Sequence, residues 1–380
     1  MRARVATSGA IVQGRAHATK FQSRPELAKR TTTPSTETPL LLRSTDRGFY
    51  CEAGGFFIDP WAPVDRAVIT HAHGDHARWG SRHYLGSHEG RHVLRTRLGP
   101  AADIETVAYG KPVDMNGVRV SLHPAGHIHG SAQVRVEHRG EVWVVSGDYK
   151  TEPDPTCAPF ETIRCHTFVT ESTFGLPIYR WRPQQEVFSD IRAWWRANRE
   201  AGHASIIFGY ALGKAQRVLA AFVDGGEGPI YTHGAVERLN RDYRDSGVAL
   251  PSTTYASGVP RGHDWGGSLI VAPPSAMGSA WLRRFGASST AFASGWMQIR
   301  GARRRRFVDR GFALSDHIDW PSLLATVSAT GAERVLVTHG YREPVVRWLA
   351  ERGVEAHIIA SQWEGELDSE GVLPEGEAPE

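Results

Sequence analysis

The residues best suited to chemistry lie in the run Thr-His-Ala-His-Gly-Asp-His at positions 70–76. The apolar stretch at 66–70 is typical of a short buried strand, and Gly74 permits a tight turn after it. His71 and His73, two positions apart, can hold one cation, while Asp75 and His76 turn toward a second. Nitrogen and carboxylate ligands without thiolate suit zinc or manganese. The run therefore predicts a metal site.

In four more segments, a strand-like apolar run is followed by a polar residue that could join the same site. Asp59 closes Gly55-Phe-Phe-Ile-Asp, and Asp148 follows Val142-Trp-Val-Val-Ser-Gly. His127 stands between glycines after the apolar stretch 118–122, and His339 ends Val335-Leu-Val-Thr-His. A single histidine beside glycine is more often an ordinary loop residue. Because α/β proteins gather functional residues at the carboxyl ends of strands, we expect the four to join the histidine loop.

Composition bounds the kind of protein that carries these residues. The chain has 380 residues, 41% of them hydrophobic, which suits one domain with an insertion. The formal net charge of +3 neither requires nor excludes a nucleic-acid partner. Three cysteines without a CxxC pair suit a reducing compartment, and no apolar stretch is long enough to cross a membrane. We therefore expect a cytoplasmic protein with no membrane partner.

Both ends of the chain differ from the middle. Residues 1–38 are basic and linker-like, which predicts a disordered basic arm. A transit peptide, or a start codon placed too early, are the alternatives. Residues 364–380 carry seven acidic side chains and no basic one, which predicts a solvated acidic tail.

The order and form of these motifs resemble the metallo-β-lactamase superfamily, in particular its nucleic-acid-cleaving beta-CASP branch. Asp59, the histidine loop, His127 and Asp148 match the superfamily motifs one by one. The branch adds an acid after the next strand and two histidines. Glu171 in Phe-Val-Thr-Glu, His317 in Leu-Ser-Asp-His-Ile-Asp and His339 match these. The resemblance implies an α/β fold, an αββα sandwich with an inserted beta-CASP α/β domain.

The resemblance also implies two divalent metal ions, with zinc favoured over manganese. One would be held by His71, His73 and His127, the other by Asp75, His76 and His339, with Asp148 bridging them. Asp59 would orient the histidine loop by hydrogen bonds. His317 would be the general acid and Glu171 would hold its ring. The expected catalytic residues are thus Asp59, Asp75, Asp148, Glu171 and His317.

The metallo-β-lactamase domain is expected at 39–178 and 301–363, with the beta-CASP insertion at 179–300. Within the insertion we expect an amphipathic helix at 182–199, a strand at 205–208 and a helix at 213–223. Tyr210 and Lys214 lie where a glycine-flanked turn opens that last helix, a ready anion site; the alternative is a helix start whose lysine faces solvent.

Three further groups are candidates for substrate contact. Arg303 and Arg304 belong to an arginine run before the His317 segment, and Trp296 ahead of it can stack a base. A charge run is otherwise a solvated face. Lys150, close behind Asp148, can touch a phosphate or be a surface lysine.

The function these features favour is a metal-dependent nuclease. The phrases at 50–54, 58–65, 70–78 and 312–320 are similar to those of bacterial ligase-associated DNA exonucleases. This resemblance implies DNA repair beside an ATP-dependent DNA ligase and a helicase. An RNA-processing nuclease is the alternative, because RNA-cleaving members share a histidine at the place of His339. A small-molecule metallo-hydrolase needs neither the insertion nor Glu171 and His317.

Overall fold

The computed structural model describes residues 40–299 and 308–363. The predicted basic arm at 1–38, the acidic tail at 364–380, and Arg303 and Arg304 lie outside the described residues. In the described ranges no helix is long and apolar enough to cross a membrane.

Two sheets face each other across a shared core. The first has the order β1-β2-β3-β4-β5-β6 and the second β19-β18-β11-β10-β9-β8-β7. The first consists of β1 (Arg43–Ser44), β2 (Phe49–Cys51), β3 (Phe56–Ile58), β4 (Arg66–Val68), β5 (His83–Ser87) and β6 (Ile104–Val107). The second consists of β7 (Val113–Met115), β8 (Val118–Pro124), β9 (Ala132–His138), β10 (Glu141–Val145), β11 (Thr167–Ser172), β18 (Arg334–Gly340) and β19 (Glu355–Ile358).

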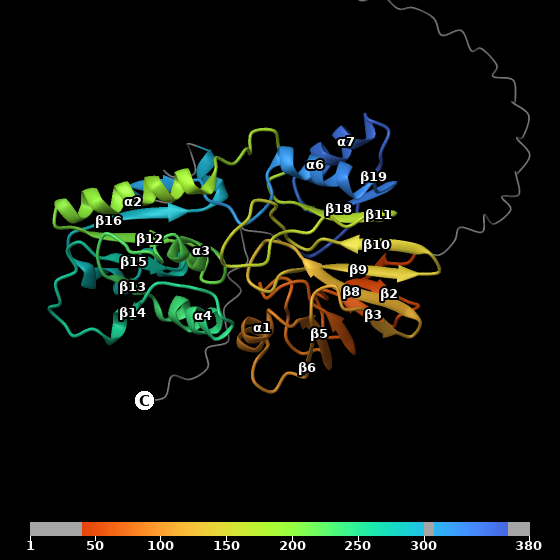
Figure 1. Cartoon of the computed structure of the whole chain (residues 1–380), viewed down its shortest axis with the longest axis horizontal. Coiled ribbons are helices and arrows are strands. Elements are labelled where there is room, and N and C mark those ends of the chain that lie inside the picture. The colour runs from red at the N-terminus through yellow and green to blue at the C-terminus, as the bar shows by residue number, and fades with distance from the viewer. Residues whose placement is uncertain (1–39, 300–307, 364–380) are drawn as a thin grey trace, which may run out of the picture. The chain divides into compact units, whose positions relative to one another are not determined.

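Strands β10, β11 and β18 of the second sheet are apolar on both faces because both of their faces are covered. Trp143 and Val145 of β10 point into the core between the sheets, while Val144 between them joins the core under the outer helices. This alternation follows from the two-residue period of a strand. The outer helices are α6 (Trp320–Thr330) and α7 (Arg342–Ala350), with α1 (Arg91–Leu98) beside β5 and β6 of the first sheet (Figure 1). The predicted αββα sandwich is thereby confirmed.

A third sheet lies between β11 and α6 in the sequence. Its strands are all parallel and follow the order β14-β13-β15-β12-β16-β17. They are β12 (Ala204–Phe208), β13 (Ile230–Thr232), β14 (Thr254–Tyr255), β15 (Leu269–Ala272), β16 (Ser288–Ala293) and β17 (Arg310–Phe312). Its α-helices are α2 (Gln184–Glu200), α3 (Lys214–Ala220) and α4 (Gly234–Asp245), and its 3-10 helices are η1 (Ala256–Gly258), η2 (Pro274–Ala276), η3 (Ala280–Phe285) and η4 (Gly295–Gln298).

The amphipathic helix and the strand expected in this region are present as α2 and β12. Val187, Ile191 and Trp195 of α2 are buried against the sheet, as their helical spacing indicates. The second helix, predicted at 213–223, is shorter in the structure: α3 ends at Ala220, and turns follow it. Strand β17 extends the sheet past residue 300, the predicted end of the insertion. The domain boundaries themselves stay a prediction.

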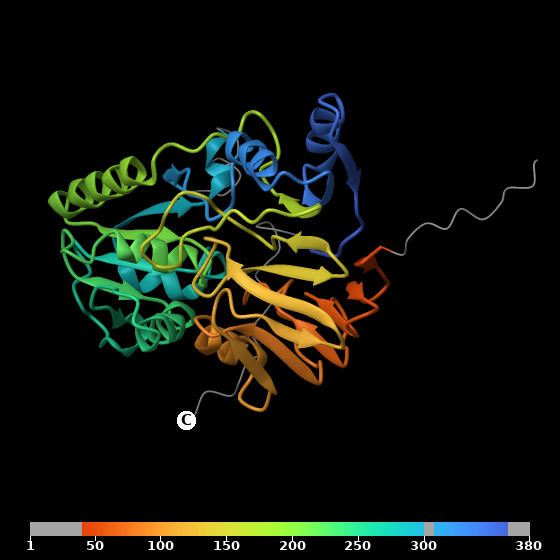
Figure 2. The ribbon, with the colours of Figure 1, turned by 45° about the vertical axis from the view of Figure 1, so that its right-hand side comes forward.

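The loops that follow several strands converge on one place. Asp59 follows β3, the histidine loop follows β4, and Asp148 comes shortly after β10. Glu171 and His339 belong to the final residues of β11 and β18, which are parallel neighbours. Figure 2 shows the ends of β8, β9 and β10 lying beside the inserted sheet. The convergence brings together side chains that the sequence separates by up to 280 residues.

Candidate metal centre

Asp59 fixes the shape of the histidine loop from outside. Its Oδ1 accepts a hydrogen bond from the Thr70 backbone N–H at 2.7 Å, and its Oδ2 lies 2.7 Å from His76 Nδ1. The Asp59 side chain is fully buried, so water does not compete for these bonds. Because Nδ1 of His76 donates to Asp59, its Nε2 is the nitrogen that can bind a metal once it has released its proton.

Three imidazoles meet one oxygen of Asp148 in the first group of ligand atoms. His73 Nδ1 lies 3.2 Å from His71 Nε2 and 3.0 Å from His127 Nε2. Asp148 Oδ2 lies 3.5 Å from His71 Nε2 and 3.8 Å from His127 Nε2. All four ligand atoms lie within 4.8 Å of one another, and all four residues are buried. This is a compact donor set for one divalent cation.

The outward nitrogens of these imidazoles are engaged elsewhere. His71 Nδ1 is 3.0 Å from Thr70 Oγ1, and His73 Nε2 donates to the Leu212 carbonyl at 3.1 Å. His127 Nδ1 donates to the Asp316 carbonyl at 2.9 Å. Each ring is thus held by one nitrogen while the other faces the group, the arrangement that outer partners give to metal-binding histidines.

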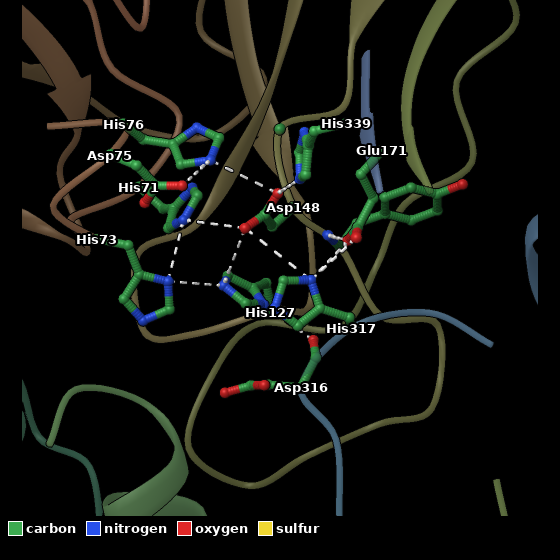
Figure 3. A network of polar contacts seen from close by, with 12 residues as sticks. His71, His73, Asp75, His76, His127, Asp148, Glu171, Asp316, His317 and His339 are labelled. Carbon is green, nitrogen blue, oxygen red and sulfur yellow. Dashed lines mark hydrogen bonds and ion pairs between the residues drawn. The ribbon is translucent and has the colours of Figure 1, made fainter. Parts of the chain in front are cut away.

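A second group gathers at the other oxygen of Asp148. Asp148 Oδ1 lies 3.1 Å from His339 Nε2 and 3.6 Å from His76 Nε2, and Asp75 Oδ2 lies 3.5 Å from His76 Nε2. Figure 3 shows Asp148 between the two groups, with one oxygen toward each. In the described part of the chain, His76 Nε2, His339 Nε2 and Asp148 Oδ1 are buried and make no hydrogen bond. Buried polar atoms are costly without a partner, so this donor set fits a cation.

The electrostatics of the cluster also favour cations. Burial drives the pKa of His71 and His127 well below the usual range, and neighbouring histidines lower it further, so these rings are neutral near pH 7. Burial lowers the pKa of His76, but the nearby carboxylates of Asp75, Asp148 and Asp59 raise it to about 10. Burial opposes ionisation of Asp148, yet His76, His317 and His339 hold its pKa well below the usual range. The negative carboxylates in the cluster therefore stabilise positively charged groups beside them, which suits a cation.

His317 and Glu171 form a pair beside the two groups. His317 Nδ1 lies 2.9 Å from Glu171 Oε2 and 3.1 Å from Oε1, and Glu171 also accepts from the Tyr149 N–H at 2.8 Å. Burial lowers the pKa of His317, but Glu171 and Asp148 raise it to about 10. The ring is therefore protonated near neutral pH, and its Nδ1 is 3.9 Å from Asp148 Oδ2.

The residues predicted to touch substrate have varied surroundings. Lys214 and Lys150 are buried; Lys214 Nζ is 2.5 Å from Asp316 Oδ1, and Lys150 Nζ donates to the Ser315 carbonyl at 2.7 Å. Tyr210 is buried as well, whereas Trp296 is partly exposed and packs 4.9 Å from Phe174 between ring centroids. The lysines thus have partners inside the protein, and the substrate contacts stay predictions.

Three further residues, which were not predicted from the sequence, hold the site in place. Trp363 stacks on the His76 ring at 5.1 Å and donates from Nε1 to the Asp59 carbonyl. Asp316 accepts from His127, and Arg217 donates to the His127 carbonyl. Asp316 adjoins His317, and Arg217 follows Lys214 by one helical turn, so these two had a sequence signal. Trp363 had none, because it comes far along the chain from both partners.

Comparison with known proteins finds relatives whose names refer to the joining or cleavage of nucleic acids. No protein-family model matches the chain. It is 32% identical over 332 residues to a protein from Opitutus terrae named Probable DNA ligase, a match that covers 86% of this chain and 32% of that protein. It is 24% identical to Endoribonuclease YSH1 of Eremothecium gossypii and 27% identical to Cleavage and polyadenylation specificity factor 73 of Drosophila melanogaster. Each of these two matches covers 45% of this chain and 26% of the relative.

The chain therefore spans about a third or less of the length of these relatives. Among solved structures, a protein of unknown function from Enterococcus faecalis matches 79% of this chain and 80% of its own, with a TM-score of 0.54 and 11% identity. At that identity the likeness concerns the fold alone.

Proposed function

The chain belongs to the metallo-β-lactamase superfamily, in its beta-CASP branch, and we propose that it is a two-metal nuclease that hydrolyses phosphodiester bonds of DNA. One observation carries the proposal: the two oxygens of Asp148 face two separate groups of buried histidines, at 3.1–3.8 Å. A carboxylate placed in this way is suited to join two cations.

His71, His73 and His127 would hold one cation, and Asp75, His76 and His339 the other, with Asp148 shared. Nitrogen and carboxylate donors suit zinc first and manganese second. Two such cations would polarise the phosphodiester, activate water near neutral pH and clamp the attacking and leaving oxygens.

The chain's own residues supply the proton chemistry. His317 holds a proton at neutral pH because Glu171 and Asp148 surround it, and it delivers that proton to the departing oxygen. Glu171 accepts the Nδ1 hydrogen bond and so fixes the tautomer and the orientation of the ring. Asp59 keeps Nε2 of His76 directed toward the second group.

The proposed substrate is a DNA end, and the proposed activity is exonucleolytic repair beside an ATP-dependent DNA ligase and a helicase. Its support is the relative named Probable DNA ligase, whose match covers 86% of this chain. RNA processing is the second candidate, favoured by the relatives named endoribonuclease and by the presence of His339. We place the activity in the cytoplasm.

The deciding experiment is cleavage of matched DNA and RNA strands, labelled at the 5′ or the 3′ end, with zinc or manganese added. Stepwise shortening of DNA alone is the expected result, and the label that is lost first gives the polarity. Preferential cutting of RNA would move the assignment to RNA processing. Absence of cleavage of either polymer by metal-loaded protein would reject the nuclease.

Metal affinity and the stability of the metal-free protein are expected to respond oppositely to pH. His76 and His317 have pKa values raised from 6.5 to about 10, so the stability they contribute is complete below pH 6.5 and is lost as the pH rises through about 10. In the same window metal affinity should rise about tenfold per pH unit, because His76 must release its proton to bind.

Thermal unfolding of metal-free protein and metal titration in buffered metal solutions measure the two trends. A control at another ion pair, His83→Gln, should leave both unchanged, because the His83 side chain is exposed and its Nδ1 lies 2.6 Å from Asp103 Oδ2. A metal affinity that does not change with pH would mean that His76 is not a ligand.

A further inference from the structure

Helix α3 carries two cations that are buried although neither belongs to the two histidine groups. Lys214 and Arg217 stand three residues apart, on one face of the helix, and are 0% and 1% exposed. Burying a charge is costly unless it is paired and hydrogen-bonded. Their partners therefore indicate what the helix does.

Lys214 binds the segment that carries His317. Its Nζ lies 2.5 Å from Asp316 Oδ1 and donates to the Leu314 carbonyl at 3.1 Å, across about a hundred residues of sequence. Burial opposes ionisation of Asp316, but Lys214 above all holds its pKa well below the usual range. The Asp316 carboxylate, which points away from Asp148 in Figure 3, is thus the partner of Lys214, while the Asp316 backbone carbonyl accepts a hydrogen bond from His127 Nδ1.

Arg217 binds the segment that carries His127. Its Nη2 donates to the His127 carbonyl at 3.0 Å, its Nε lies 3.4 Å from Asp154 Oδ2, and its Nη1 donates to Gln184 Oε1 at 3.3 Å. The guanidinium is thus fixed on three sides, and one of them is the main chain of a predicted metal ligand. A planar fork with several donors holds a carbonyl more rigidly than an ammonium does.

We propose that Lys214 and Arg217 are positioning residues, which hold the main chains of the His317 and His127 segments so that both imidazoles meet the metal centre in working geometry. The proposal rests on the proposed function for its catalytic readout only. It assigns Lys214 a task different from the phosphate contact considered from the sequence. One turn of the inserted helix would then hold in place a site whose predicted metal ligands all come from the sandwich.

The first test separates positioning from simple stabilisation. Lys214→Met leaves the Asp316 carboxylate buried without its cation and should lower the melting temperature, the metal affinity and kcat together. In the double variant Lys214→Met/Asp316→Asn both charges are gone, so most of the stability should return. Metal affinity should stay roughly ten- to a hundredfold weaker, because the Leu314 carbonyl still lacks its donor and the loop is not held.

The second test uses Arg217→Lys, which keeps the charge but loses the fork. We expect loss of metal from the His127 group first, and a changed visible absorption spectrum of the cobalt-loaded protein, since that spectrum reports ligand geometry. Gln216→Met is the matched control on the same helix. Gln216 is equally buried, but its bonds go to Gly213, Ala211 and Asn240, all within the inserted region, so the cobalt spectrum should not change.

Two outcomes would overturn the proposal. Full recovery of metal affinity and spectrum in the double variant would reduce the ion pair to a stabilising contact. A rise in KM alone for Lys214→Met, with metal affinity and kcat unchanged, would return Lys214 to phosphate binding. If the wild-type protein binds metal but cleaves neither DNA nor RNA, the proposed function fails, while metal affinity and the cobalt spectrum still decide the positioning role.

Discussion

Asp148→Ala is expected to remove both metal ions and to abolish cleavage. Its Oδ2 faces the group of His71 and His127, and its Oδ1 faces His339 and His76, so one substitution takes a donor from both groups. Losing an outer partner of a metal ligand typically costs ten- to a hundredfold in affinity, and losing a shared ligand must cost more. Metal content per chain and cleavage of an end-labelled strand are the two measurements.

The control for this variant is Asp103→Ala. Asp103 is an exposed carboxylate that pairs with His83 and belongs to neither group of predicted metal ligands. Its loss should leave metal content and cleavage at the wild-type level. Thermal unfolding shows that each variant is folded before metal is added. Normal cleavage by folded Asp148→Ala would contradict the two-metal proposal.

His317→Ala is expected to keep both metals and to lose most turnover. General acid catalysis contributes about 10²–10⁴-fold, and an alanine at this position has no proton to give to the departing oxygen. The companion variant Glu171→Gln should lower the pKa of His317, because Glu171 is the foremost group that raises it. Since the acid must be protonated, the alkaline limit of turnover should then move to lower pH.

A change of substrate tests the same role from the chemical side. A phosphodiester with a weakly basic phenolate as leaving group needs no proton on departure, so His317→Ala should cleave it nearly as fast as the wild-type protein does. Equal losses on both substrates would argue against an acid. Loss of metal would instead make His317 a ligand, a role its place in groups with Asp148, Glu171 and His127 also permits.

The local sequence was enough to predict much of this site, because several of its residues leave the same strand or turn. The apolar run before Thr70 and the turn at Gly74 predict that His71, His73 and His76 leave one strand together. The period of α2 and the apolar run of β12 likewise predicted their form, since these patterns depend on neighbouring residues alone. The roles of the clustered residues in metal binding stay predictions.

The tertiary structure decided which distant groups meet. Lys214 opens a helix after a glycine, a pattern equally suited to a phosphate, yet packing places its ammonium against Asp316, 102 residues away. Packing between distant segments also stacks Trp363 on His76 and turns the two oxygens of Asp148 toward different groups. Spacing along a chain records turns and faces of single elements, whereas a contact between elements depends on how the sheets and helices pack.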